Sequence, residues 1–468
     1  MTKRTNTSKT ALGIVAAIVA VAGLWGLDRW KPLGFDWPDE WESRVAPLAS
    51  YVERHTGFDF KNPVPVRFLG DKDFNELVTE NEEDLTDEDK EYYDNIGALL
   101  RALGLASGNV DIFEDQNSLN KGRILAYYSP KDREMVIRAD KKTLEGAALS
   151  PALRAVVVHE LTHALQDQVF GLAKIRNKAK DSGHGEALTT LIEGHALGIE
   201  SAYANDNFSD AEREQYGSVT QADDDADVAD IPQILSAQQM APYVFGPTFV
   251  KAIEREKGFK LEDAFLKKQP TSLEQVILPS KYFAVDKPED LDAPKTPKGA
   301  KYILDDQINQ LDLYFLLTRT LGAPLALKYS DTWGNGRYVV YSRDKVICST
   351  IHLRGETDKD TEQLAAAFTK WAQRDTLKNA KVKLHEDHVV VDACDPGASV
   401  RHDLPTEDDT SQIFWRAGDI VYIWQSEAGV DAECAATGLY TEFTTEELVS
   451  NDAVVMRYNE LLSECALD

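Results

Sequence analysis

Two histidines four residues apart, with a glutamate between them, are the most informative residues of this 468-residue chain. His159, Glu160 and His163 form the pattern HExxH. Residues four apart on a helix share one face, so both imidazoles can ligate a single Zn²⁺ ion. Glu160 lies about 100° around the helix from His159, where it need not ligate but can take a proton from an attacking water as general base. The pattern therefore predicts a hydrolytic zinc site.

A zinc site of this kind needs a third protein ligand, and no third histidine follows at the short spacing HExxHxxGxxH. Glu193, on the next predicted helix, is favoured because apolar and small residues flank it, as expected of a ligand that faces the interior. Glu193 and His195 lie about 200° apart around a helix, so they cannot both bind one metal ion. Glu186 and His195 remain the alternatives to Glu193.

The zinc-binding pattern falls within the clearest helix of the sequence, residues 151–170. Ser150 is a suitable N-cap, and Pro151 occupies the favoured first position of the helix. A polar connection leads to a second predicted helix over about 185–204, which positions Glu193. Two β-rich runs separated by a turn predict a hairpin over 123–138, just before the zinc helix.

HExxH followed by a glutamate on the next helix resembles the gluzincin metallopeptidases, the thermolysin-like clan. The resemblance implies a zincin-like domain in which the hairpin 123–138 supplies an edge strand that pairs with a substrate backbone. Residues 242–250 (PYVFGPTFV) are similar to the Tyr-x-x-Gly helix of gluzincin aminopeptidases. In that family the tyrosine hydroxyl stabilises the oxyanion, a role that the resemblance assigns to Tyr243. The segments HELTHALQDQ, EGHA, PTSLEQVILPSKY and WGNGRYVVY together resemble a group of largely uncharacterised secreted bacterial and archaeal proteins.

The sequence departs from the gluzincin pattern in two places. In many gluzincins an acidic residue one turn past the third ligand orients a zinc histidine, but that position is Leu197 in this chain. Asp167, Glu186 and Glu200 are the acidic residues that can substitute. The Gly-Ala-Met-Glu-Asn substrate loop of the aminopeptidases is absent, so exopeptidase activity is not implied.

The net charge limits the possible partners of the protein, and the N-terminal segment indicates its location. With 51 Lys and Arg against 79 Asp and Glu, the net charge is −28, and a nucleic-acid partner is not expected. Residues 11–27 are uncharged and follow residues 1–10, which contain Lys3, Arg4 and Lys9 and are expected to stay in the cytoplasm. This pattern predicts a transmembrane signal anchor, or alternatively a cleaved signal peptide. Either reading places the rest of the chain in the periplasm or outside the cell, membrane-anchored or secreted.

The remainder of the chain predicts an α+β fold in two parts. A zincin-like metallopeptidase domain is expected over 35–285, a linker over 286–300 and a C-terminal α+β accessory domain over 301–468. The expected helices of the accessory domain are 303–322 and 359–375, and its expected strands are 337–353, 381–393 and 412–425.

The four cysteines, two further histidines and an acidic run also allow predictions. The cysteines allow three pairings and predict one or two structural disulfides. They are Cys348, Cys394, Cys434 and Cys465. His385 and His388 are expected to be exposed near a strand, and the acidic run 221–230 is expected to be a solvated loop.

Two functions follow from these patterns. The favoured one is a membrane-anchored or secreted zinc metallopeptidase, acting on a peptide or protein substrate, with Zn²⁺ held by His159, His163 and Glu193 and with Glu160 as general base. The alternative is a catalytically inactive, metallopeptidase-like envelope protein that binds a partner. A degenerate site would usually have lost Glu160 or a histidine, and all are present, so the enzyme is favoured.

Overall fold

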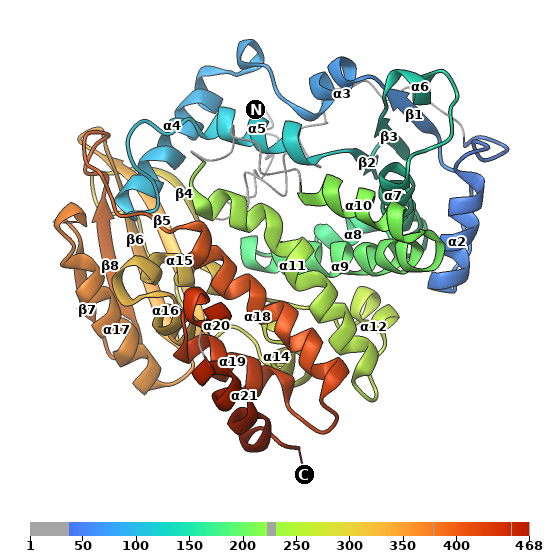
Figure 1. Ribbon diagram of the computed structural model, residues 1–468. Helices are drawn as coiled ribbons and strands as arrows, with labels where there is room; N and C mark the ends of the chain where they lie inside the picture. The colour runs from blue at the N-terminus through green and yellow to red at the C-terminus, as the bar shows by residue number, and fades with distance from the viewer. Residues whose placement is uncertain (1–36, 222–230, 378, 451, 468) are drawn as a thin grey trace.

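A computed structural model describes residues 37–221, 231–377, 379–450 and 452–467 (Figure 1). It shows a mixed α+β fold with a helical region and two sheets. The predicted N-terminal segments 1–10 and 11–27, and nearly all of the acidic run 221–230, lie outside the described residues. Among the residues that the structure describes, no helix combines the length and apolar character that crossing a bilayer requires.

A three-stranded sheet lies beside the helix that carries the HExxH pattern. Its order is β1-β3-β2, with β1 at Val66–Leu69, β2 at Ala126–Ser129 and β3 at Glu134–Arg138. β2 and β3 are antiparallel, which confirms the hairpin predicted over 123–138, whereas β1 runs parallel to β3. β2 is therefore an edge strand, and it packs against α7 (Pro151–Phe170).

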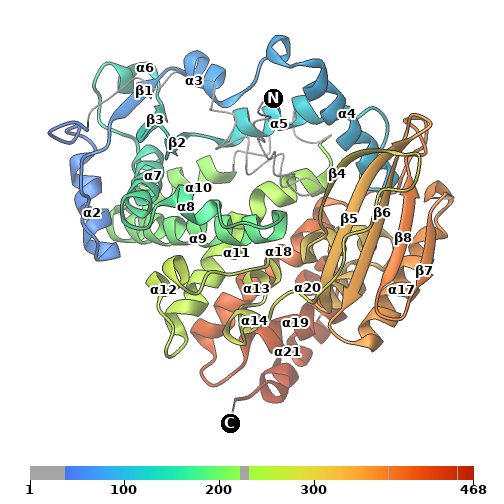
Figure 2. The same ribbon diagram turned by 180° about the vertical axis from the view of Figure 1, so that it is seen from behind.

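Three long helices pack one against the next: α7, α9 (Ser182–Asn207) and α11 (Gln233–Arg255). α7 begins as predicted, with the Ser150 side chain accepting a hydrogen bond from the Leu153 backbone N–H and with proline at the first position. α9 packs against both α7 and α11. Figures 1 and 2 show α9 and α11 between the three-stranded sheet on one side and a larger sheet on the other.

The larger sheet has five antiparallel strands in the order β4-β5-β6-β8-β7. α17 (Asp358–Ala372) packs against it and begins at the capping box formed by Thr357 and Asp360, close to the predicted start. The strands are β4 (Lys301–Gln307), β5 (Trp333–Arg343), β6 (Val346–Gly355), β7 (Lys381–Leu384) and β8 (Val389–Cys394).

Two predictions for the C-terminal part were wrong. Residues 412–425 were expected to form a strand, but they belong to helix α18 (Glu407–Ser426). Its buried residues Ile413, Ala417, Ile420 and Ile423 recur at helical spacing, which outweighs the strand preference of its β-branched and aromatic side chains. The helix expected over 303–322 is divided into strand β4 and helix α15 (Gln310–Leu321), because Asn309 caps the helix at that point.

The other helices surround these elements. They are α2 (Ala46–Thr56), α3 (Asp71–Val78), α4 (Asp87–Ala102), α5 (Ile112–Arg123), α6 (Lys141–Leu144), α8 (Leu172–Arg176), α10 (Asp210–Gln221), α12 (Leu261–Leu266), α13 (Glu274–Ile277), α14 (Pro279–Phe283), α16 (Ala323–Ser330), α19 (Ala432–Glu442), α20 (Thr445–Ser450) and α21 (Asp452–Glu464), with short 3-10 helices at Glu82–Asp84 and Asp375–Leu377.

One continuous cluster of buried apolar side chains includes residues from both sides of the predicted linker 286–300. Phe249 of α11 and Trp371 of α17 both belong to it. The segment 286–300 lies against the sheet, where the Glu289 backbone N–H donates to the carbonyl of Gly334. A second cluster fills the space between the three-stranded sheet, α2 and α7. The division into a catalytic and an accessory domain remains a prediction.

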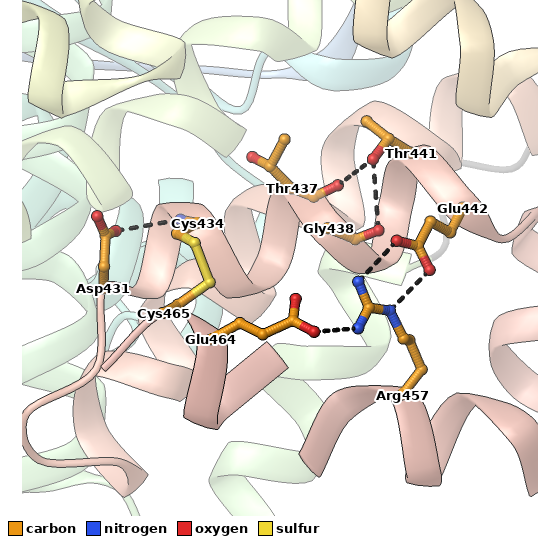
Figure 3. Close-up of a disulfide and its surroundings, with 9 residues drawn as sticks. All are labelled: Asp431, Cys434, Thr437, Gly438, Thr441, Glu442, Arg457, Glu464 and Cys465. Carbon is orange, nitrogen blue, oxygen red and sulfur yellow. Dashed lines mark hydrogen bonds and ion pairs between the residues drawn. A yellow bond between two sulfur atoms is a disulfide. The ribbon is translucent and has the colours of Figure 1, made fainter. Parts of the chain in front are cut away.

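Two disulfides use all four cysteines. Cys348–Cys394 joins paired positions of β6 and β8. Cys434–Cys465 joins α19 to the residue that follows α21, and Figure 3 shows Arg457 of α21 beside it, paired with carboxylates of both helices. Disulfides persist mainly outside the cytoplasm, so this pairing indicates an oxidising compartment.

A buried glutamate of α13 predicts pH-dependent stability. Burial raises the pKa of Glu274 to about 8, although Lys281 beside it at 3.3 Å acts in the opposite direction. In the unfolded chain the pKa of a glutamate is about 4.3. As the pH rises from about 4 to about 8, the unfolded chain loses this proton first, so the free energy of unfolding falls.

Glu274→Gln is expected to flatten this decline in stability between pH 5 and pH 8, because an amide does not titrate. Urea denaturation at several pH values measures the slope. Glu262→Gln, at an exposed position of the neighbouring helix α12, is the matched control and should keep the wild-type slope. An unchanged slope in Glu274→Gln would contradict the prediction.

Candidate metal centre

His159, His163 and Glu193 meet in the interior, where α7 packs against α9. The Nε2 atoms of the two histidines are 3.0 Å apart, and each lies 3.1 Å from Glu193 Oε2. The three residues are 7%, 9% and 6% exposed, respectively. The structure thus brings together the two histidines of the HExxH pattern and the favoured third ligand.

This arrangement of donor atoms fits a tetrahedral zinc ion. Nitrogen and oxygen atoms bound to one tetrahedral zinc at about 2.0–2.1 Å lie about 3.3 Å apart, close to the distances found here. Each histidine has an acceptor at Nδ1, so in the neutral tautomer its Nε2 presents a lone pair to the shared point. Two imidazole lone pairs and one carboxylate therefore converge in a buried space, where a cation would be bound favourably.

The other ring nitrogen of each histidine is held by a residue outside the triad. His159 Nδ1 donates to Glu200 Oε2 at 2.9 Å, and Glu200 Oε1 accepts from the Tyr216 hydroxyl at 2.5 Å. Glu200 lies seven residues after Glu193 and therefore on the same face of α9. Of the three acidic substitutes considered from the sequence, Glu200 is the one in contact with a histidine of the triad.

Gln166 orients His163 in the way that Glu200 orients His159. Sequence reasoning did not select Gln166 for this role. Its Oε1 accepts from His163 Nδ1 at 2.9 Å. Its Nε2 donates to the carbonyl of Ile192 and to His195 Nδ1, both at 3.0 Å. His163 and Gln166 are three residues apart on α7, so helical spacing was the available signal. Such contacts fix the tautomer and the orientation of a metal ligand.

Glu200→Ala is expected to weaken zinc binding about 10- to 100-fold, because the His159 ring loses its orienting acceptor while all three triad residues remain. Competition with a chromophoric chelator measures the affinity. Glu214→Ala, at an exposed position of α10, should bind zinc like the wild type. Equal affinities in the two variants would mean that Glu200 has no part in positioning His159.

Glu160 lies outside the triad, next to the edge strand. The backbone N–H of Tyr128 in β2 donates to Glu160 Oε2 at 2.7 Å. Burial raises the pKa of Glu160, while the neighbouring His163 and His159 lower it. The carboxylate is therefore held between the edge strand and the candidate metal ligands, where a general base is required.

Tyr243 of α11 lies near the ring of His159 and is partly exposed. Its ring centroid is 6.4 Å from that of His159, and 42% of the residue is exposed. The charge of Glu193, followed by burial and the charge of Glu160, raises the pKa of Tyr243 well above its ordinary value. The hydroxyl therefore keeps its proton and can donate it in a hydrogen bond.

A contact between two glycines places the Tyr243 helix close to the triad. A Cβ added to Gly194 of α9 would lie 2.3 Å from the backbone of Gly246 in α11. A larger residue at either position would push the helices apart. Gly194 follows Glu193 directly, so the tyrosine and the third candidate ligand are carried by helices in close contact.

Arg176 of α8 is a further charged residue that sequence reasoning missed. Its Nε is buried, and within the described part of the chain it has no hydrogen-bond partner. The charges of Glu193 and Asp167 act on its guanidinium, and burial lowers its pKa. In the sequence it stands among other basic residues (KIRNKAK), so composition offered no signal that distinguishes it.

The alternative ligands lie elsewhere. Glu186 Oε2 accepts from the side-chain amide of Asn309 at 2.8 Å. His195 contacts Gln166, and burial together with His163 lowers its pKa to about 4. Within the described residues one other group of His, Cys, Asp or Glu side chains has ligand atoms within 4.8 Å of one another: Glu274, Asp286 and Glu356. Lys281 forms ion pairs with all three of those carboxylates.

Comparison with protein-family models, with curated proteins and with solved structures found no match. The resemblance to gluzincins accordingly rests on the HExxH pattern and on the buried group of His159, His163 and Glu193.

Proposed function

We propose that the protein is a zinc-dependent metallopeptidase that hydrolyses peptide bonds outside the cytoplasm. The observation that carries the proposal is the convergence of His159, His163 and Glu193 within 3.1 Å of one another. Glu160 beside this triad supplies the group that separates a hydrolytic site from a purely structural zinc site.

Each residue of the site has a separate role in the proposed hydrolysis. When bound, a zinc ion would supply acidification of a water molecule and polarisation of the scissile carbonyl. Glu160 takes the proton of the attacking water and passes it to the leaving amine. Tyr243 donates a hydrogen bond to the carbonyl oxygen as negative charge develops there.

The edge strand β2 supplies a means of holding an extended peptide. The Leu125 carbonyl accepts from the Arg138 backbone N–H on the β3 side, whereas the Tyr128 N–H points the other way, to Glu160. Alternating backbone groups of β2 therefore face away from β3, and in the described structure no strand pairs with them. A substrate strand pairing with this edge would lie next to the general base.

The location and the partners belong to the same proposal. The segment 11–27 anchors the chain in the membrane, or directs its secretion if it is cleaved, and the catalytic part lies in the periplasm or outside the cell. The two disulfides agree with such a compartment. The partner is then an exported peptide or protein substrate.

The test is metal analysis combined with peptide cleavage. The purified protein is expected to contain about one zinc per chain and to cleave members of a broad peptide library. A zinc chelator should stop cleavage, and added Zn²⁺ should restore it. Full zinc occupancy without cleavage would instead favour the inactive, partner-binding envelope protein, and absence of a stoichiometric transition metal would contradict the site itself.

A further inference from the structure

Three histidines from two separate parts of the chain gather at the β7–β8 end of the five-stranded sheet. His352 lies on β6, and His385 and His388 lie in the turn between β7 and β8. The ring centroids of His352 and His388 are 4.5 Å apart. Those of His385 and His388 are 5.0 Å apart, with nearly parallel planes. We call these residues the three-histidine cluster.

The strand register places all three side chains on one face of the sheet. His352 pairs with Val390, and His388 lies two residues before Val390, so the two histidines point to the same face. The His385 backbone N–H donates to the carbonyl of His388, which places His385 opposite it across the turn. Side chains of the other face, such as Leu353, are buried in the apolar core. The cluster therefore lies on the accessible face.

Two of the imidazoles have the hydrogen-bond partners at Nδ1 that metal-ligating histidines usually have. His352 Nδ1 lies 2.9 Å from the carbonyl oxygen of Asp292, and His388 Nδ1 lies 2.7 Å from Asp387 Oδ1. Both partners are acceptors, so Nδ1 carries the hydrogen and Nε2 of the neutral ring carries a lone pair. A carbonyl or carboxylate at the second nitrogen is the usual companion of a metal-bound imidazole.

We propose that the three-histidine cluster is a second metal site, which binds one divalent transition-metal ion through imidazole nitrogens. Imidazole ligands suit Cu²⁺, Ni²⁺ and Zn²⁺ rather than Ca²⁺ or Mg²⁺, and Cu²⁺ is the tightest-binding ion of the series. The ligand atoms of the three histidines do not all lie within 4.8 Å of one another, and the His385 ring stacks on His388. Binding therefore requires the exposed His385 side chain to turn toward His352 and His388. The bound ion would tie the β7–β8 turn to β6 and, through His352, to the segment that contains Asp292.

The proposal is independent of the peptidase site and is tested with Cu²⁺ alone. The full chain, with its triad loaded with zinc, is dialysed against Cu²⁺, and both metals are measured by elemental analysis. Cu²⁺ that displaces zinc from the triad lowers the zinc content by the same amount, so the expected result is one Cu²⁺ per chain beyond any zinc lost. Its electron paramagnetic resonance spectrum should be typical of several nitrogen ligands. All four cysteines are in disulfides, so no thiol competes for the ion.

Variants of the turn provide the decisive comparison. His385→Asn and His388→Asn should each weaken Cu²⁺ binding by more than about 100-fold, because loss of a direct ligand exceeds the loss caused by outer contacts. His55→Asn, at an exposed histidine of α2 paired with Asp206, should bind like the wild type. Unchanged Cu²⁺ binding in both turn variants, or binding only at millimolar Cu²⁺, would overturn the proposal. Zinc content measured before Cu²⁺ is added serves as the folding control, since the turn does not contribute to the triad.

Discussion

Glu160→Gln is expected to reduce peptide hydrolysis by at least about 10²–10⁴-fold, the usual contribution of a general base, while zinc content stays close to that of the wild type. The glutamine keeps the size of the side chain, and its carbonyl oxygen can still accept the hydrogen bond from the Tyr128 N–H. Only the ability to take up a proton is lost. Cleavage assays and metal analysis on the same preparation measure both quantities.

The matched control is Glu254→Gln, which makes the same chemical change at an exposed position of α11. It should leave both zinc content and cleavage unchanged. If Glu160→Gln were as active as the wild type, the hydrolysis would come from another site or from a contaminant. If the wild type held zinc but cleaved nothing, the protein would belong to the partner-binding class, and the same substitution would leave partner affinity nearly unchanged.

Glu193→Ala is expected to release the metal ion, with a loss of zinc affinity larger than the 10- to 100-fold typical of outer contacts. The substitution leaves the two imidazoles and removes the one carboxylate of the triad. Glu186→Ala removes the same group from the same face of α9, seven residues earlier, but its partner is Asn309 rather than the triad. This variant should therefore retain zinc, and so should His195→Ala.

Thermal stability gives a second measurement of the same site. Zinc at 1,000 times its dissociation constant stabilises a one-site protein by about 4 kcal/mol, an increment that Glu193→Ala should lose and Glu186→Ala should keep. The increment is the stability of a variant with zinc minus the stability of the same variant without zinc. Any loss of stability caused by removing the side chain itself is present in both and cancels. An equal or reversed ranking of the two variants would exclude Glu193 and favour whichever residue ranked first.

Local patterns were sufficient for the elements that carry the chemistry. The spacing of His159 and His163 specified a shared helix face, and Ser150 with Pro151 specified where that helix begins. The hairpin of β2 and β3 also followed from its two β-rich runs and the turn between them. In each case the determining interactions lie within a few residues along the chain.

Local patterns failed where burial competed with intrinsic preference. The strand expected over 412–425 is a helix, because a row of apolar residues at helical spacing packs into the core and outweighs β preference. The break between β4 and α15 was missed for a different reason. A single capping residue, Asn309, separates the two elements within the largely polar run 305–310 (DDQINQ).

The sequence by itself determined which residues could ligate a metal ion and which glutamate could act as base, since these follow from side-chain chemistry and helical periodicity. Only the tertiary structure decided that Glu193, rather than Glu186 or His195, meets the two histidines, and that Glu200 and Gln166 orient them. Those outcomes depend on the rotation and close approach of α7, α9 and α11. The close approach of α9 and α11, for example, depends on the contact between Gly194 and Gly246. These residues are distant in the sequence, so no pattern of neighbouring residues could predict it.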